Sequence, residues 1–154
     1  DMEHWAAFQF SFRRMEGLLQ AVARGERGEA PASIVMLGGD IHHAYLAGVE
    51  VPGAKSKVWQ AVCSPFRNPL DKQERFMARL GASGPAERLA RWIAQRAGVE
   101  RPAIDWKLVQ KPTFDNQFAT IELRGRDAKM KIEKTVPGNW QKPEIDVTLE
   151  HDLT

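Results

Sequence analysis

One short stretch of the sequence gathers residues that suit metal chemistry. IVMLGGDIHHAYLAGVEV, residues 34–51, places Asp40, His42 and His43 directly after two glycines. Glycine lets a backbone turn sharply or approach another group closely. Asp40 and His42 stand two apart, so in an extended backbone both side chains point to the same side. A carboxylate beside an imidazole suits a divalent transition-metal ion. The spacing predicts metal ligation, with a turn cap at Asp40 and a surface histidine pair as the alternative.

Short apolar runs must position this cluster. The segment SIVMLGG, residues 33–39, predicts a buried strand because it is short, rich in β-branched residues and bounded by proline and glycine. AYLAGVEV (44–51) and KVWQAVCS (57–64) predict two further strands, joined by the turn PGAKS. The cluster therefore follows the carboxyl end of a strand, which is where α/β sheets place their sites.

Helical patterns lie on both sides of these strands. Apolar residues spaced three and four apart predict an amphipathic helix that contains Trp5, Phe8, Met15 and Leu19. Asn68 and Pro69 are the capping and first residues expected of a second helix, which Gly81 ends. SGPAERLARWIAQRAG, residues 83–98, predicts a third helix that ends at Gly98.

The last third of the chain has the alternation of strands. AIDWKLV (103–109), FATIELRGRDAKMKIEK (118–134) and EIDVTL (144–149) predict a strand, a hairpin that turns at Gly125, and a final strand. The element order is then helix, strands, two helices, strands. This order predicts a mixed α/β (α+β-like) layered architecture, with residues 1–154 as a single domain or part of one.

Composition narrows the functional classes. The chain has 154 residues, of which 43% are apolar and 27% charged, as in a soluble globular domain. Its net charge of +2 is too balanced to predict a nucleic-acid partner, and no apolar run approaches a membrane span. One cysteine excludes an intrachain disulfide. The opening DMEHW, without an initiator methionine, predicts a piece of a longer protein, and no compartment is predicted.

Other reactive residues give weaker signals. A cysteine phosphatase needs arginine six residues after its cysteine, but Pro69 stands there, so Cys63 is interpreted as a small core residue. Ser64 lacks the glycine-flanked elbow of a serine hydrolase. Arg67 could bind a phosphoryl oxygen or pair with an acid, and His4 could reach the site or lie on the surface.

The motif GGDIHHAY after a strand, with DMEHWAAF ahead of it and SPFRNPL and FDNQFATIEL behind, resembles the C-terminal part of PhoD-like alkaline phosphatases. These belong to the calcineurin-like metallophosphoesterases, whose last metal motif reads Gly-His-x-His. Residues 39–42 fit that frame with aspartate in place of the first histidine. The resemblance covers nearly the whole chain and implies the C-terminal half of a β-sandwich flanked by helices.

The resemblance also implies an activity. Asp40 and His42 would ligate Fe, Zn, Mn or Ca, and the complete enzyme would hydrolyse phosphate esters. His43 would be catalytic, by steadying phosphoryl oxygens or protonating the leaving group, with Arg67 and His4 binding substrate. The earlier metal motifs of the superfamily are missing, so the isolated chain is expected to be inactive. A non-catalytic binding or assembly module is the alternative, and an unpaired edge at residues 33–39 predicts a homodimer.

Overall fold

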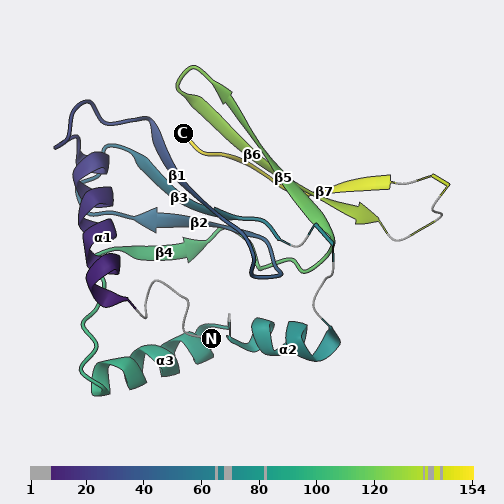
Figure 1. Cartoon of the computed structure of the whole chain (residues 1–154), viewed down its shortest axis with the longest axis horizontal. Helices are drawn as coiled ribbons and strands as arrows, with labels where there is room; N and C mark the ends of the chain where they lie inside the picture. Colours follow the sequence, from purple (N-terminus) through teal and green to yellow (C-terminus); the bar gives the residue numbers. More distant parts are fainter. Residues whose placement is uncertain are drawn as a thin grey trace.

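The computed structural model describes residues 8–64, 66–67, 71–81, 83–136, 138, 141–142 and 144–154. Within these residues the chain forms three helices and seven strands (Figure 1). In chain order they are α1 (Gln9–Arg24), β1 (Ser33–Gly38), β2 (Tyr45–Glu50), β3 (Lys57–Val62), α2 (Lys72–Gly81), α3 (Gly84–Arg96), β4 (Asp105–Leu108), β5 (Gln117–Arg124), β6 (Asp127–Val136) and β7 (Glu144–Asp152). The expected mixed α/β class is confirmed. No described helix has the length and apolar character needed to cross a membrane.

The strands form two sheets. The first has the order β1-β3-β2-β4, in which β1 and β3 are parallel and the other pairs antiparallel. The second is an antiparallel meander, β5-β6-β7, with a register shift in β6 between Ile132 and Glu133. Because β3 lies between β1 and β2, the connection from β1 to β2 must cross the end of β3. This connection carries the Asp-x-His-His cluster.

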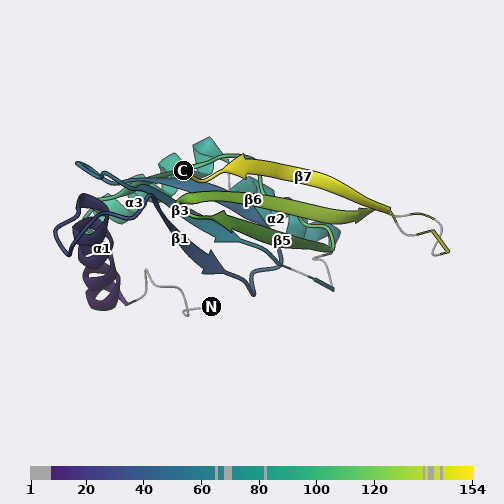
Figure 2. The same ribbon diagram turned by 90° about the horizontal axis from the view of Figure 1, so that it is seen from above.

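The first sheet is covered on both faces. Successive side chains of a strand point to opposite faces, so in β1 Ile34 and Met36 pack towards α1 while Val35 packs towards the second sheet. Figure 2 shows the two sheets from above, with α1 at one end. The core between the sheets consists of Ala44, Leu46, Ala61, Ala128, Met130, Ile132, Leu149 and Leu153. The core under α1 consists of Leu19, Ala23, Val51 and Val58.

The buried face of α1 differs from the expected apolar stripe. Leu19 is buried as expected, but Phe8 and Met15 are exposed, and Glu16 takes a buried position. The carboxylate of Glu16 accepts hydrogen bonds from the backbone N–H groups of Ala103 and Ile104. A buried carboxylate is tolerated when such donors satisfy it, and here it ties α1 to the segment before β4.

The start of α2 also differs from the prediction. Asn68 and Pro69 lie outside the described residues, and the described helix begins at Lys72. Its cap is Asp71, whose Oδ1 accepts from the backbone N–H groups of Gln73 and Glu74, each at 2.9 Å. The Glu74 carboxylate accepts in return from the Asp71 N–H at 3.1 Å. This reciprocal pair is a capping box, formed by D-x-x-E where Asn-Pro was expected.

The glycine signals at element ends are confirmed. Gly98 follows α3 with a φ of 75°, and its N–H donates to the Gln95 carbonyl while that of Val99 donates to the Ala94 carbonyl. These two bonds form a Schellman motif, which needs a left-handed residue at the glycine position. Gly125 turns the β5–β6 hairpin with a φ of 62°. Helix ends and hairpin turns thus follow directly from the sequence.

Candidate functional site

The loop between β1 and β2, residues 39–44, lies against the end of β3. The Cys63 N–H donates to the Gly38 carbonyl at 3.2 Å, which continues the parallel ladder by one residue. A Cβ atom on Gly38 would meet the Val62 side chain at 3.2 Å, closer than most such contacts. Gly38 is therefore needed for β1 to approach β3 where the loop begins.

The backbone of this loop is not extended. Asp40 has a φ of 64° and His42 a φ of 54°, and among the described residues these are the two non-glycine residues with positive φ. Left-handed backbone costs an L-residue about 1–2 kcal/mol, with aspartate among the more tolerant types. The expectation that Asp40 and His42 share one side of an extended strand is therefore wrong. The chain bends here because it must cross the end of β3. Both side chains are exposed.

His43 is held in place by a hydrogen bond and two aromatic rings. Its Nδ1 lies 2.6 Å from the carbonyl oxygen of Ile41. A carbonyl oxygen only accepts, so Nδ1 carries the proton and the neutral ring keeps its lone pair on Nε2. The imidazole stacks on Tyr45, with ring centroids 5.6 Å apart, and tilts against Phe114 at 5.7 Å. One tautomer and one ring position are thereby fixed.

Burial sets the charge of His43. Partial burial lowers the pKa of His43 below the ordinary histidine value, and this outweighs the hydrogen bond to Ile41, which raises it. The nearby His42 lowers the pKa further. The neutral imidazole is therefore favoured at pH 7, with a proton-accepting nitrogen at Nε2.

Two arginines of α2 lie near this loop, and no spacing in the sequence indicates them. Thr113 and Ala44 pair through two backbone hydrogen bonds of 2.9 and 3.0 Å, which brings Phe114 against His43. The Arg79 guanidinium lies 5.5 Å from the Phe114 ring centroid. The Arg75 guanidinium lies 3.8 Å from the Asp115 carboxylate. The residues after β4 thus link α2 to the loop, a long-range contact that local patterns do not encode.

No described contact joins the remaining expected residues to the loop. His4 lies outside the described residues. Arg67 is exposed and makes no hydrogen bond or ion pair within the described part of the chain. Cys63 packs against the core between the sheets, and its partial burial raises the pKa of the thiol. The interpretation of Cys63 as a small buried residue is confirmed in part, because the side chain packs against the core but is only partly buried.

The loop offers ligand atoms for part of a metal site. A carboxylate at Asp40 and imidazoles at His42 and His43 are ligand types that Zn²⁺, Mn²⁺ and iron accept. Among the described residues, however, no group of three or more His, Cys, Asp or Glu side chains is arranged to hold an ion. These residues fit a portion of a metal centre and do not complete one.

Comparison of the chain with protein-family models, with curated proteins and with solved structures finds no match in any of the three.

The geometry itself therefore defines the chemistry that is available. The loop combines an exposed carboxylate, an exposed imidazole and a neutral imidazole with a fixed tautomer. A histidine whose Nδ1–H is bound to a backbone carbonyl has its Nε2 prepared either to ligate a cation or to accept a proton. These are components of hydrolytic and metal-binding sites.

Proposed function

We propose that this chain is the C-terminal portion of a PhoD-like metallophosphoesterase, an enzyme that hydrolyses phosphate esters. The observation that carries the proposal is the loop GGDIHHAY at the carboxyl end of β1, in which Asp40 and His42 both have left-handed backbone. Unfavourable backbone of this kind clusters at functional sites, because elsewhere glycine relieves it. The position of the loop after a strand also agrees with the frame of the superfamily motif.

In this proposal Asp40 and His42 supply part of a metal centre for Fe, Zn, Mn or Ca. When bound, such ions generate hydroxide from water and neutralise charge on the phosphoryl group. Asp40 contributes a negative charge and His42 a nitrogen donor, and the complete enzyme supplies the other ligands from the superfamily's earlier metal motifs, which this sequence lacks. The exposure of both side chains leaves them accessible to such ligands.

His43 has the most constrained role. In its neutral form it accepts a proton at Nε2 rather than donating one. To steady a phosphoryl oxygen or to protonate a leaving group it must first become protonated, which its lowered pKa opposes. A phosphoryl anion close to the ring reverses that balance, because an opposite charge favours the imidazolium. Arg67 and His4 are proposed to bind substrate in the same complete site.

A second candidate is a binding or assembly module that keeps the fold without catalysis. The observation that favours it is the incomplete ligand set among the described residues. Exposed apolar side chains on α2 and α3, among them Phe76, Met77 and Trp92, supply contact surface for a partner.

Metal titration of the chain tests the first proposal. Calorimetry with Mn²⁺ or Zn²⁺ is expected to show weak binding, which Asp40→Ala and His42→Ala each abolish. Asp146→Ala and His151→Ala are matched controls outside the loop and are expected to leave binding unchanged. Binding that survives both loop substitutions contradicts the ligand assignment.

Turnover assays test whether the site is incomplete. We expect no hydrolysis of p-nitrophenyl phosphate or bis-p-nitrophenyl phosphate above background by this chain, with or without added metal. The physical reason is that one carboxylate and two imidazoles cannot fill the coordination of a two-ion site. Metal-dependent turnover that His42→Ala removes would show that the described loop suffices.

A further inference from the structure

A cavity of about 820 Å³ lies between α3 and the first sheet, apart from the loop at residues 39–44. This volume falls within the roughly 300–1,000 Å³ of small-molecule sites. Its walls include Tyr45, Trp106 and Leu108 from the strands and Ala90 and Ala94 from α3. Trp106 and Leu108 keep 46% and 37% of their surface exposed, so a flat apolar ligand can contact the part of the indole that Arg91 leaves uncovered and an aliphatic side chain.

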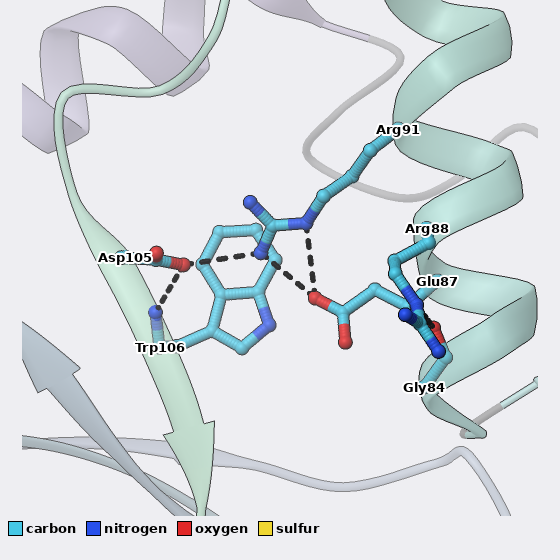
Figure 3. A network of polar contacts seen from close by, with 6 residues as sticks. All are labelled: Gly84, Glu87, Arg88, Arg91, Asp105 and Trp106. Carbon is cyan, nitrogen blue, oxygen red and sulfur yellow. Dashed lines mark hydrogen bonds and ion pairs between the residues drawn. The ribbon is translucent and has the colours of Figure 1, made fainter.

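The position of α3 beside this cavity is fixed by Arg91. Its guanidinium donates to the Glu87 carboxylate at 3.0 and 2.8 Å and to the Asp105 carboxylate at 3.1 Å (Figure 3). It also lies 5.6 Å from the ring centroid of Trp106. These hydrogen bonds raise the pKa of Arg91 and lower that of Asp105, so both remain charged. One guanidinium thus faces two carboxylates, Glu87 and Asp105, so this group of three side chains has an excess of negative charge.

The other acid at the cavity is also paired. Glu100, which lines the cavity, forms an ion pair of 2.7 Å with Arg13 of α1. Glu87 is bound to Arg91. Neither carboxylate is left to neutralise the remaining cations of the wall.

Those cations are Arg101 and Lys107. Neither forms an ion pair with a carboxylate in the part of the chain that the structure describes. When the Gln95 amide is turned so that its oxygen faces Arg101, this oxygen accepts hydrogen bonds from Arg101 Nε at 3.0 Å and from Arg101 Nη2 at 3.3 Å. A neutral amide orients the guanidinium without cancelling its charge. The cavity therefore joins an aromatic wall to two cations that form no close ion pair among the described residues, although Arg101 also interacts electrostatically with Asp105.

We propose that this cavity binds a planar aromatic anion, with the ring against Trp106 and a carboxylate or phosphate group at Arg101 and Lys107. An indole face and aliphatic walls favour a flat apolar ring. Arginine and lysine favour anionic oxygen atoms, arginine by paired N–H donors and lysine as a point charge. The site uses none of the residues proposed for the metal centre.

Calorimetric titration tests this assignment with three probes of similar size: 1-naphthyl phosphate, 1-naphthoate and neutral 1-naphthylmethanol. All titrations contain a chelator, so a failure of the metal proposal does not affect them. Both anions are expected to bind at least about tenfold more tightly than the alcohol, which corresponds to one charge-assisted contact. Tighter binding of the phosphate than of the carboxylate, or the reverse, identifies which anion the site prefers.

Substitutions locate the binding. The double variant Arg101→Gln, Lys107→Gln is expected to lower the affinity for both anions at least about tenfold and to leave that for the alcohol unchanged. Trp106→Ala is expected to lower the affinity for all three probes. Arg88→Gln is the matched control, because Arg88 lies on the same helix and its one hydrogen bond to a described residue is to the Gly84 carbonyl at 3.4 Å (Figure 3). This control is expected to leave the affinity for each of the three probes unchanged.

Three results would overturn the proposal. They are equal affinity for the anions and the alcohol, an equal loss in Arg88→Gln and in the double variant, and no binding of either anion at millimolar concentration. Arg101→Lys keeps the charge and is expected to retain most of the affinity for both anions. It tests the proposal even if the double variant fails to fold, which circular dichroism would show.

Discussion

The indole Nε1 of Trp59 donates a hydrogen bond of 2.7 Å to the carbonyl oxygen of Leu153, a residue 94 positions further along the chain. Trp59 belongs to β3, at the centre of the first sheet, and Leu153 follows β7 of the second. The Leu153 side chain is fully buried in the core between the sheets. This contact joins the two sheets through one directional bond in addition to apolar packing.

We therefore expect Trp59→Phe to destabilise the fold by about 1–3 kcal/mol, because the Leu153 carbonyl loses its donor and core contacts are removed. Urea denaturation measures the change in the free energy of unfolding. Trp92→Phe is the matched control, since Trp92 is half exposed on α3, and it is expected to stay within about 0.5 kcal/mol of the parent chain. Equal effects would mean that the hydrogen bond contributes nothing.

The left-handed backbone of the candidate loop gives a second prediction. Asp40→Gly and His42→Gly are each expected to raise the free energy of unfolding by about 0.5–1 kcal/mol, because glycine adopts positive φ without a steric penalty. Glu50→Gly, at an exposed strand position, is the control and is expected to be destabilising. Thermal and urea unfolding measure the change in the free energy of unfolding for each variant. Loss of stability in both loop variants would show that these side chains support the fold.

The parts of the fold that local patterns encode were predictable from the sequence. The strand after Pro31, the helix end at Gly98 and the hairpin turn at Gly125 each depend on neighbouring residues alone. Asp71 shows the limit of this reasoning. The pattern Asn-Pro is the more typical start of a helix, but the described start of α2 is capped by the pattern D-x-x-E at Asp71. Asn68 was the only cap expected from the sequence, whereas the described start of α2 is capped by Asp71, which forms the reciprocal pair with Glu74.

The long-range features were not predictable. Nothing near Glu16 in the sequence indicates that its carboxylate meets the backbone before β4. The same holds for Phe114, which reaches His43 only through the pairing of Thr113 with Ala44. The shape of the candidate loop follows from the sheet order, in which β3 separates β1 from β2. Residue types indicated metal chemistry, but their geometry depended on that order.

Cys63 gives a prediction about pH. Burial raises the pKa of its thiol above the ordinary cysteine value, so the folded chain holds less thiolate at a given pH than the unfolded chain. Alkylation by iodoacetamide is expected to reach its half-maximal rate at a higher pH in buffer than in urea. Because the unfolded thiol loses its proton first, the free energy of unfolding falls as pH rises past the unfolded pKa. The single cysteine makes the rate unambiguous, and identical pH profiles would contradict the prediction.

The edge of the first sheet gives a prediction about assembly. β1, with sequence SIVMLG, contains no charged residue and among the described strands pairs only with β3. Leu37 on this strand is 73% exposed. Open apolar edges template pairing with another chain, so we expect a homodimer by light scattering. Leu37→Lys is expected to give a monomer. Leu123→Lys, at an equally exposed leucine of β5, is expected to leave the dimer intact, and a monomeric parent chain would exclude this assembly.

The insertion of β3 between β1 and β2 also leads us to expect an order of folding. β2 and β3 are antiparallel neighbours joined by residues 51–56, so this hairpin can close early with little loss of chain entropy. We expect β1 to add to it afterwards, as a parallel strand whose following loop, residues 39–44, crosses the end of β3. A nascent or partly unfolded chain can therefore possess the hairpin while residues 39–44 still lack their bend. On this expectation the side chains of Asp40 and His42 acquire their arrangement when β1 docks, so whatever delays the docking of β1 also delays the bend of that loop.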